Sequence, residues 1–287
     1  MSKVGFMGLG AMGLPMASNL AKAGLNLMVY NRTPGKAAPL KNEGAQVAGS
    51  PDALIDWADI VVMMLSGPEA IDDTLGKRLS AAPEELAGKL VVNMGTNPPS
   101  YSKNLAIRLE QAGAVFVEAP VLGTQEPAIQ GALLVMSSGP KEVQEKLAPI
   151  FDAVGSQVVF CGDVPKAGMM KLAVNLVLSA ALEGLFEGTH FAQKAGLDLR
   201  TYFQLIVNSP LGNPVFALKA KKLLEQDYSP QASLGTVREM LKHIVDTAYD
   251  IGAFIPSTLT NLNLSTAAMN QGLADEDACA MIKVFDK

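Results

Sequence analysis

The residues that indicate chemistry most directly form a glycine-rich turn near the N-terminus. Gly8, Gly10 and Gly13 have the spacing Gly-x-Gly-x-x-Gly, between an apolar run at 4–7 and a helical pattern at 14–23. The first glycine permits a tight turn, the second lets the backbone approach a pyrophosphate, and the third lets helix and strand pack closely. The phosphates then lie at the positive end of the helix. We therefore expect a dinucleotide site. Its loop also contains Leu9, Ala11 and Met12.

The residues after the second expected strand, 26–30, bear on the choice between NAD(H) and NADP(H). A site specific for NAD places an acidic residue here, which binds the ribose 2′-hydroxyl. Asn31 lacks the charge that would repel a 2′-phosphate, and the planar fork of Arg32 can bind one. Thr33 and Lys36 could add a hydroxyl and a second cation. The sequence therefore favours NADP(H) over NAD(H), and a solvated turn is the alternative interpretation of Arg32.

Strands and helices alternate over the first half of the chain. Beyond the two strands already named, apolar runs predict strands at 60–65, 90–94, 115–118, 133–137 and 158–160. Helical patterns occur at 51–57, 101–112 and 141–154. This alternation predicts an α/β domain with a mostly parallel, doubly wound sheet of the Rossmann type. We expect this NADP-binding domain to span residues 1–164.

Strand patterns fade after residue 164, and long helical patterns follow. They cover 167–195, 199–207, 214–226, 237–251, 257–271 and 275–285. We therefore expect an all-α domain over 165–287, which contributes to substrate binding and oligomerisation. The helix at 167–195 is apolar on several faces. This favours central packing and a homodimer or homotetramer.

Composition excludes several classes of function. The net charge of −5 and the two histidines argue against nucleic-acid binding and against a histidine-built metal site. Cys161 and Cys279 lie far apart without metal-ligand partners, so we expect buried, reduced thiols and no metal. The most apolar helical stretch, 172–185, is short for a membrane span, and no signal peptide precedes the glycine turn. These features predict a soluble, cytoplasmic protein.

Several further motifs follow the glycine turn in a characteristic order. They are Pro15-Met16-Ala17-x-Asn19-Leu20, Met64-Leu65, Thr96 within Met94-Gly95-Thr96-Asn97-Pro98, Glu118-Ala119-Pro120-Val121, and Gly168-x-x-Lys171-x-x-x-Asn175. Over essentially the whole chain, this set resembles the β-hydroxyacid dehydrogenase family, which includes 3-hydroxyisobutyrate dehydrogenases. The segment Gly123-Thr124-x-x-Pro127-Ala128 is similar to the branch of glyoxylate/succinic semialdehyde reductases.

The resemblance implies an oxidoreductase that transfers a hydride between NADP(H) and the carbonyl of a small aldehyde or keto acid. It implies that Leu65 and Thr96 line the ribose and nicotinamide. It also implies that Lys171 is the catalytic residue, with Asn175 one helical turn later. The chemistry agrees with this role, because hydride delivery to a carbonyl leaves an alkoxide that needs a proton and a positive charge. Small and apolar neighbours would disfavour the charged form of Lys171 and make it a better proton donor.

The substrate loop departs from the family pattern. The family commonly has Pro-Val-Ser-Gly-Gly, whose serine and amides contact the substrate carboxylate. Here Leu122 replaces the serine, while the amides of Gly123 and Thr124 and the Thr124 hydroxyl remain as substrate contacts.

A second departure concerns a Lys-Asp pair of the family. Its position corresponds to Glu239-Met240, where the charge is reversed, although Arg238 and Lys242 lie near. An exposed helix residue is the alternative interpretation of Glu239. The two departures together leave open a less polar or larger carbonyl substrate.

Two alternative functions remain open. Imine reductases share the Asn-Arg-Thr turn and lack the Lys-Asp pair, but usually carry aspartate or tyrosine in place of Lys171. A non-catalytic cofactor-binding protein would be expected if the lysine were lost. Because Lys171 and Asn175 are both present, the sequence favours carbonyl reduction.

Overall fold

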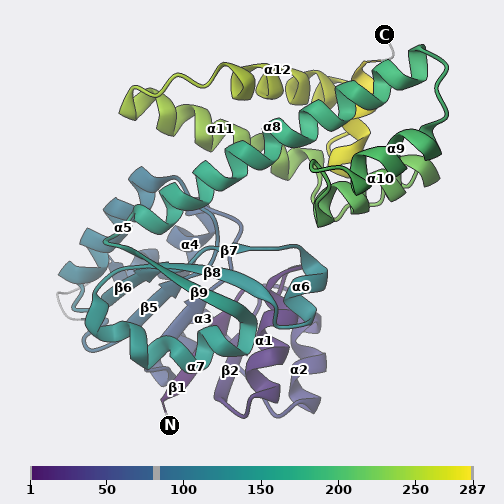
Figure 1. Cartoon of the computed structure of the whole chain (residues 1–287). Helices are drawn as coiled ribbons and strands as arrows, with labels where there is room; N and C mark the ends of the chain where they lie inside the picture. The colour runs from purple at the N-terminus through teal and green to yellow at the C-terminus, as the bar shows by residue number, and fades with distance from the viewer. Residues whose placement is uncertain (1, 80–84, 286–287) are drawn as a thin grey trace. The chain divides into compact units, whose positions relative to one another are not determined.

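The computed structural model describes residues 2–79 and 85–285 (Figure 1). The chain divides into two compact units, Met1–Lys171 and Leu172–Lys287. The first is an α/β unit of the Rossmann type and the second is helical, which confirms the predicted fold class. Along the chain, the division between the units falls within helix α8 (Lys166–Lys194), and the predicted boundary at residue 164 lies just before that helix.

Within the described residues, the first unit contains a nine-stranded sheet in the order β3-β2-β1-β4-β5-β6-β8-β7, with β9 beside β8. The parallel part consists of β1 (Lys3–Met7), β2 (Asn26–Tyr30), β3 (Gln46–Val47), β4 (Ile60–Met63), β5 (Leu90–Asn93) and β6 (Val115–Glu118). The strand order reverses between β1 and β4. In a doubly wound sheet, ligands bind at this switch point, outside the carboxyl ends of the strands.

The remaining strands extend the sheet beyond β6. They are β7 (Val121–Leu122), β8 (Leu133–Ser138) and β9 (Gly155–Gly162). Strand β8 runs antiparallel to β6 and β7 and parallel to β9. Because β6 and β7 are separated only by Ala119-Pro120, the chain returns to the sheet at once after Glu118.

Helices cover both faces of the sheet (Figure 1). Their bounds are α1 (Gly13–Lys22), α2 (Ala38–Asn42), α3 (Pro51–Trp57), α4 (Pro68–Leu79), α5 (Pro99–Gln111), α6 (Gln125–Ile129) and α7 (Gln144–Val154), with short 3-10 helices η1 (Pro34–Ala37) and η2 (Lys141–Val143). Consecutive strand residues point to opposite faces. Accordingly Phe6 packs in a core with α1 and α7, whereas Met7 packs in a second core with α3, α4 and α5.

The second unit follows α8 with α9 (Leu199–Asn208), α10 (Pro214–Glu225), α11 (Leu234–Ile251), α12 (Pro256–Asn270) and the 3-10 helix η3 (Ala278–Val284). Side chains of Asp198, Asn213 and Ser233 accept hydrogen bonds from the first-turn amides of α9, α10 and α11. Gly252 ends α11 in the left-handed conformation. Phe186, Phe203 and other large apolar side chains form the core of this unit.

Helix α8 is long and strongly apolar. Among the described helices, it meets the length and composition criterion for crossing a membrane, with a mean hydropathy of 1.5 in its most apolar window. A core helix of a soluble protein, which is mostly buried, meets the same criterion. Only 28% of the α8 window is buried within the described structure, so the predicted central packing of this helix is wrong for the single chain. The first turns of α8 carry the polar side chains of Lys171, Asn175 and Ser179, all buried in the protein.

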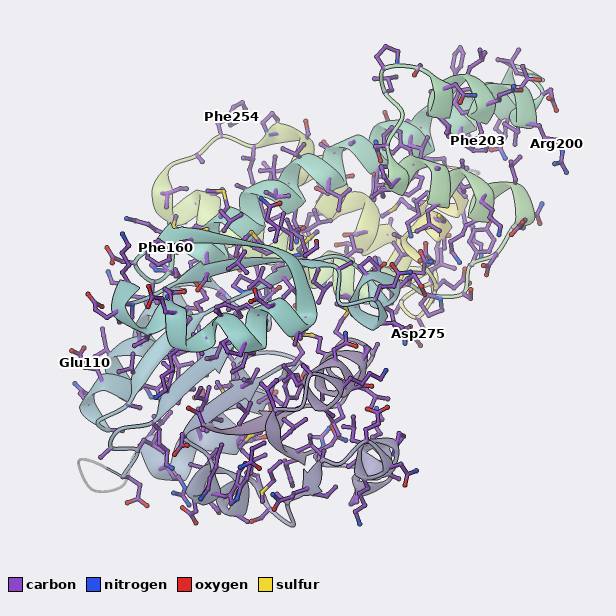
Figure 2. The ribbon with its side chains drawn as sticks, turned by 60° about the horizontal axis from the view of Figure 1, so that its bottom comes forward. Glu110, Phe160, Arg200, Phe203, Phe254 and Asp275 are labelled. Carbon is purple, nitrogen blue, oxygen red and sulfur yellow. The ribbon has the colours of Figure 1, made fainter. Side chains whose placement is uncertain are left out.

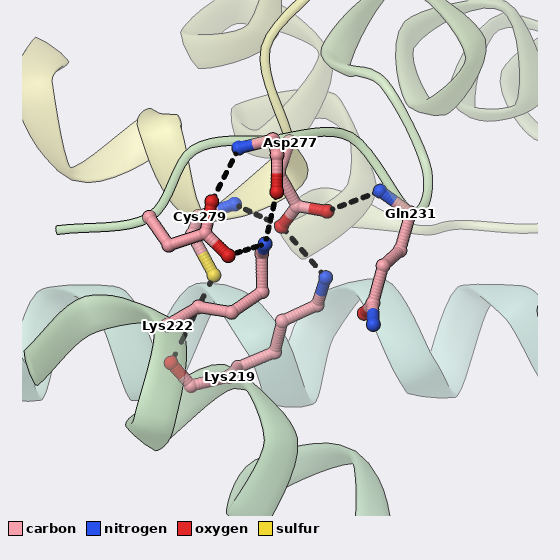
Figure 3. A network of polar contacts seen from close by, with 7 residues as sticks. Lys219, Lys222, Gln231, Asp277 and Cys279 are labelled. Atoms are coloured by element: carbon pink, nitrogen blue, oxygen red, sulfur yellow. Dashed lines mark hydrogen bonds and ion pairs between the residues drawn. The ribbon is translucent and has the colours of Figure 1, made fainter. Parts of the chain in front are cut away.

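A buried polar network joins α10 to the C-terminal segment (Figure 3). The Lys219 ammonium lies 2.7 Å from the Asp277 carboxylate, and both side chains are almost fully buried. The same carboxylate accepts hydrogen bonds from the amides of Gln231 and Cys279. This network explains why the predicted helix at 275–285 is wrong. Asp277 is tied to Lys219, and the chain forms η3 instead.

We predict that Asp277→Asn lowers the free energy of unfolding by about 3 kcal/mol, because the buried Lys219 ammonium loses its counter-charge. Burial opposes ionisation of Asp277, but the bonds from Lys219 and the two amides outweigh it, so its pKa lies below the ordinary value. The stabilisation is therefore complete above the unfolded-state pKa of about 4 and is lost as the pH falls below it.

Urea unfolding of the wild type and the variant at pH 7, and again below pH 4, measures both effects. The exposed Asp275 (Figure 2) supplies the control Asp275→Asn, expected within about 0.5 kcal/mol of the wild type. Equal stability of Asp277→Asn and wild type at pH 7 would show that the ion pair contributes nothing.

Candidate active site

The glycine turn after β1 requires glycine at two of its three positions. Gly8 has a φ of +96°, and a Cβ there would lie 2.3 Å from the carbonyl oxygen of Met64, after β4. A Cβ on Gly13 would lie 1.8 Å from the Gly8 carbonyl oxygen. Around Gly10, in contrast, no heavy atom of residues 2–79 or 85–285 lies within 4 Å of an added Cβ. The turn is therefore closed toward the protein and open at Gly10, as an approaching pyrophosphate requires.

The N-terminus of α1 has amides available for an anion. Among the residues that the structure describes, no side chain caps this end of the helix, and its first turn contains no acidic residue. Helix N-termini bind phosphates through their unpaired amides and their dipole. The open turn and the uncapped helix together fit the diphosphate of a dinucleotide cofactor.

Asn31 connects the end of β2 to the glycine turn. Its Oδ1 accepts a hydrogen bond of 2.9 Å from the Leu9 amide, and its Nδ2 donates one of 3.0 Å to the Thr33 carbonyl oxygen. Arg32 and Lys36 are exposed beside it, and neither forms an ion pair with any described residue. The side chain of Asn31 therefore shapes the turn, while the two cations are available to a ligand.

The loops after β4 and β5 meet the glycine turn at the carboxyl edge of the sheet. Leu65 is half-buried, and its side chain would lie 3.0 Å from a Cβ on Gly8. A Cβ on Gly95 would lie 2.9 Å from the Leu65 carbonyl oxygen. Thr96 follows directly and is half-buried. Leu65 and Thr96 are thus placed in adjacent loops, beside the turn expected to bind the cofactor.

Asn97 is a residue at this edge that the sequence did not single out. It is 2% exposed, and neither its Oδ1 nor its Nδ2 has a hydrogen-bond partner among the described residues. A buried amide without partners is costly unless water or a bound molecule supplies them. The Asn97 amide is therefore suited to form hydrogen bonds with a molecule that binds at the end of β5. In the sequence, the position of Asn97 as a polar residue between Thr96 and two prolines is the feature that could have indicated it.

Lys171 lies in the second turn of α8 and is 9% exposed. Its Nζ donates a hydrogen bond of 2.7 Å to the carbonyl oxygen of Val121, in β7. Burial lowers the pKa of Lys171 to about 8. Asn175 is also buried, one turn later on the same helix. The predicted catalytic pair therefore consists of the Lys171 amine, whose pKa is lowered, and the Asn175 amide one helical turn later.

The segment that binds Lys171 continues into the predicted substrate loop. Leu122 is half-buried in β7, directly after Val121. Gly123 has a φ of +135°, and a Cβ there would meet the Leu133 side chain at 2.6 Å. Thr124 precedes α6, and its hydroxyl does not cap that helix. Residues 122–124 therefore directly follow Val121, whose carbonyl oxygen accepts the hydrogen bond from the Lys171 amine.

The second departure from the family pattern lies on α11. Glu239 is exposed, and its Oε1 lies 2.9 Å from Arg238 Nη1. Arg238 also reaches the Thr266 hydroxyl of α12, at 3.4 Å. Arg238 is therefore occupied by partners in its own unit, and Lys242 is exposed on the same helix. Among the described residues, no group of three or more His, Cys, Asp or Glu is arranged to hold a metal ion.

Both units of the chain are similar to known dehydrogenases. Residues 3–162 match the NAD-binding domain of 6-phosphogluconate dehydrogenase, and residues 166–285 match the model described as NAD-binding of NADP-dependent 3-hydroxyisobutyrate dehydrogenase. The chain is 32% identical over 283 residues to glyoxylate/succinic semialdehyde reductase 2 of Arabidopsis thaliana. The match covers 98% of this chain and 79% of that protein.

Solved structures are also similar to this chain over nearly its whole length. A 3-hydroxyisobutyrate dehydrogenase from Salmonella typhimurium has a TM-score of 0.88 at 27% identity, covering 99% of this chain and 100% of that one. Psf3 in complex with NADP+ and 2-OPP has a TM-score of 0.86 at 25% identity, with the same coverage. These matches confirm the resemblance predicted from the sequence. The chain therefore belongs to the β-hydroxyacid dehydrogenase family and is an NAD(P)-dependent oxidoreductase acting between hydroxyl and carbonyl groups.

Proposed function

We propose that this enzyme reduces the carbonyl group of a small aldehyde or keto acid with NADPH, and that Lys171 is its general acid. The observation that carries the proposal is the buried Lys171 amine, 2.7 Å from the Val121 carbonyl oxygen and with a pKa lowered to about 8. The similarity to a glyoxylate/succinic semialdehyde reductase supports the substrate class. The similarity to a structure that contains NADP+ supports the cofactor.

The Lys171 ammonium has the properties that the protonation step needs. When bound, the nicotinamide supplies the hydride, and the carbonyl oxygen then needs a proton. An ammonium has three donors, and the Val121 carbonyl accepts one of them. The other two have no acceptor in the described part of the chain and remain for a substrate oxygen. Because burial disfavours its charged form, Lys171 gives up a proton more readily than a solvated lysine. In the oxidative direction, the neutral amine accepts the proton again.

The Lys171 hypothesis predicts that Lys171→Met lowers kcat by about 10³-fold while NADPH still binds, since general acid catalysis contributes about 10²–10⁴-fold. In the wild type, kcat for reduction should fall as the pH rises through about 8, because the protonated amine is needed. The measurements are pH–rate profiles and a fluorescence titration of NADPH. Lys166→Met changes an exposed lysine on the same helix and serves as the control. Turnover by Lys171→Met near the wild-type rate would remove Lys171 from the mechanism.

The preference for NADPH is proposed to depend on Arg32. Asn31 leaves the end of β2 without a carboxylate, and Arg32 is exposed beside it without an ion-pair partner among the described residues. A guanidinium can bind a phosphate through two parallel hydrogen bonds.

We expect Arg32→Ala to weaken NADPH binding about tenfold, or about 1.4 kcal/mol, and to leave NADH binding unchanged. Calorimetric titration with both cofactors measures the ratio. Arg200→Ala, which removes an exposed arginine of the second unit (Figure 2), should change neither affinity. An unaltered preference in Arg32→Ala would assign cofactor choice to other residues.

The substrate is proposed to be selected partly by Leu122, which stands where the family commonly has a serine. NADPH oxidation with a panel of semialdehydes, keto acids, simple aldehydes and cyclic imines tests both the reaction and this position. We expect turnover of carbonyl compounds. Turnover of imines alone would favour the alternative of an imine reductase.

On the same panel, Leu122→Ser should raise kcat/KM for glyoxylate and succinic semialdehyde about tenfold, because a hydroxyl can bind their carboxylate. Propionaldehyde has no carboxylate and serves as the matched control, with no gain expected. Equal effects on acids and on propionaldehyde would show that Leu122 does not select for carboxylates.

We further propose that the enzyme is a homodimer or homotetramer and that it is located in the cytoplasm. Large apolar side chains are exposed along α8, namely Met170, Val174, Val177, Leu178 and Phe191. Exposed apolar surface of this kind is typical of association surfaces. Both cysteines are free, as is usual in a reducing compartment. Cys279 is buried as predicted, but the prediction of burial is wrong for Cys161, which is half-buried in β9.

A further inference from the structure

The Glu118 carboxylate is buried at the end of β6 and has no assigned role. Its side chain is 1% exposed. Its Oε2 accepts a hydrogen bond of 2.9 Å from the Gly168 amide, in the first turn of α8. A hydrogen bond of 3.2 Å from the Ser138 hydroxyl reaches the same oxygen. Glu118 therefore binds the start of a helix 50 residues later in the chain.

The position of this carboxylate is fixed by the sheet. Glu118 and Ser138 are paired residues of the antiparallel strands β6 and β8. The first amides of a helix have no partner within the helix, and a carboxylate is favoured at that end by the helix dipole. Glu118 thus supplies from the sheet the partner that the first turn of α8 lacks.

The approach of Glu118 to α8 is close enough to require glycine on the helix. A Cβ on Gly168 would lie 2.6 Å from Glu118 Oε1 and 3.3 Å from Oε2. An alanine at this position would displace either the carboxylate or the helix. The glycine of the Gly168-x-x-Lys171 motif therefore has a physical explanation in this contact.

The segment 118–121 contacts α8 at two points, one helical turn apart. The Glu118 side chain holds the Gly168 amide, and the Val121 carbonyl holds the Lys171 ammonium. Residues three apart on a helix lie on the same face. We propose that Glu118 is a positioning residue, which fixes the first turn of α8 and thereby holds the Lys171 ammonium against Val121. This proposal rests on the proposed role of Lys171 in catalysis.

The test compares Glu118→Gln with Glu118→Leu. Glutamine keeps an oxygen acceptor for the Gly168 amide, whereas leucine has a similar size and no acceptor. We expect Glu118→Gln to keep kcat within about threefold of the wild type and Glu118→Leu to lower it about 10- to 100-fold, with NADPH affinity unchanged in both. Glu110→Leu removes an exposed glutamate of α5 (Figure 2) and should change nothing.

Two readouts do not depend on turnover. Amide hydrogen exchange of residues 166–171 should accelerate in Glu118→Leu and stay slow in Glu118→Gln. The pKa of the Lys171 amine, measured by competitive acetylation and mass spectrometry, should rise in Glu118→Leu toward the ordinary value of 10.5, because a released side chain regains solvent. Gly168→Ala should shift both readouts in the same direction, which covers the case that Glu118→Leu folds poorly.

The outcomes separate this proposal from the function on which it rests. If Glu118→Leu and Gly168→Ala leave the amide exchange and the Lys171 pKa unchanged, Glu118 does not position the amine. Equal loss of activity in Glu118→Gln and Glu118→Leu would also overturn the proposal, since it would assign the effect to charge. If the Lys171 pKa shifts while turnover is unaffected, Glu118 positions the amine but Lys171 is not the general acid.

Discussion

The chemistry proposed for this enzyme depends on one buried ammonium held by one main-chain carbonyl. Removing the Lys171 charge from water is costly, and the bond to Val121 only partly replaces its hydration. The remaining cost appears as a pKa lowered to about 8, which brings the protonation change of this amine near neutral pH. The rest of the first unit maintains this arrangement. The sheet fixes β7, and the Glu118 carboxylate fixes the helix that carries the amine.

Local sequence patterns predicted the parts of the fold whose causes are local. The glycine spacing, the alternating apolar runs and the long helical periods each reflect short-range geometry, and the structure confirms the Rossmann-type sheet followed by helices. Helix α4 was not predicted, because its sequence is rich in charge and low in apolar periodicity. The two-residue strands β3 and β7 are too short to give a pattern. The helix predicted at 275–285 was wrong, because the chain there follows the buried Asp277–Lys219 pair.

The candidate site also has some features that the sequence predicts and others that it does not. The glycine turn and the lysine with its asparagine are motifs, so sequence alone could propose them. The contacts that give them their properties join residues far apart in the chain, as Glu118 to Gly168 and Val121 to Lys171 do. No periodicity encodes such pairs. Substrate preference is the least predictable part. Leu122 has no hydroxyl, and Glu239 pairs with Arg238 of its own helix, so neither position has the group that the resemblance led us to expect.

The proposed role of Lys171 is tested most directly by titrating its side chain. Selective ¹³C labelling of lysine ε-carbons, with Lys171→Met to assign the signal, gives the pKa of this amine by NMR. We expect a value of about 8, because the amine is buried in the folded protein. A value near 10.5, the ordinary pKa of a solvated lysine, would contradict it, since the amine would then lie in water and have no special capacity to donate a proton.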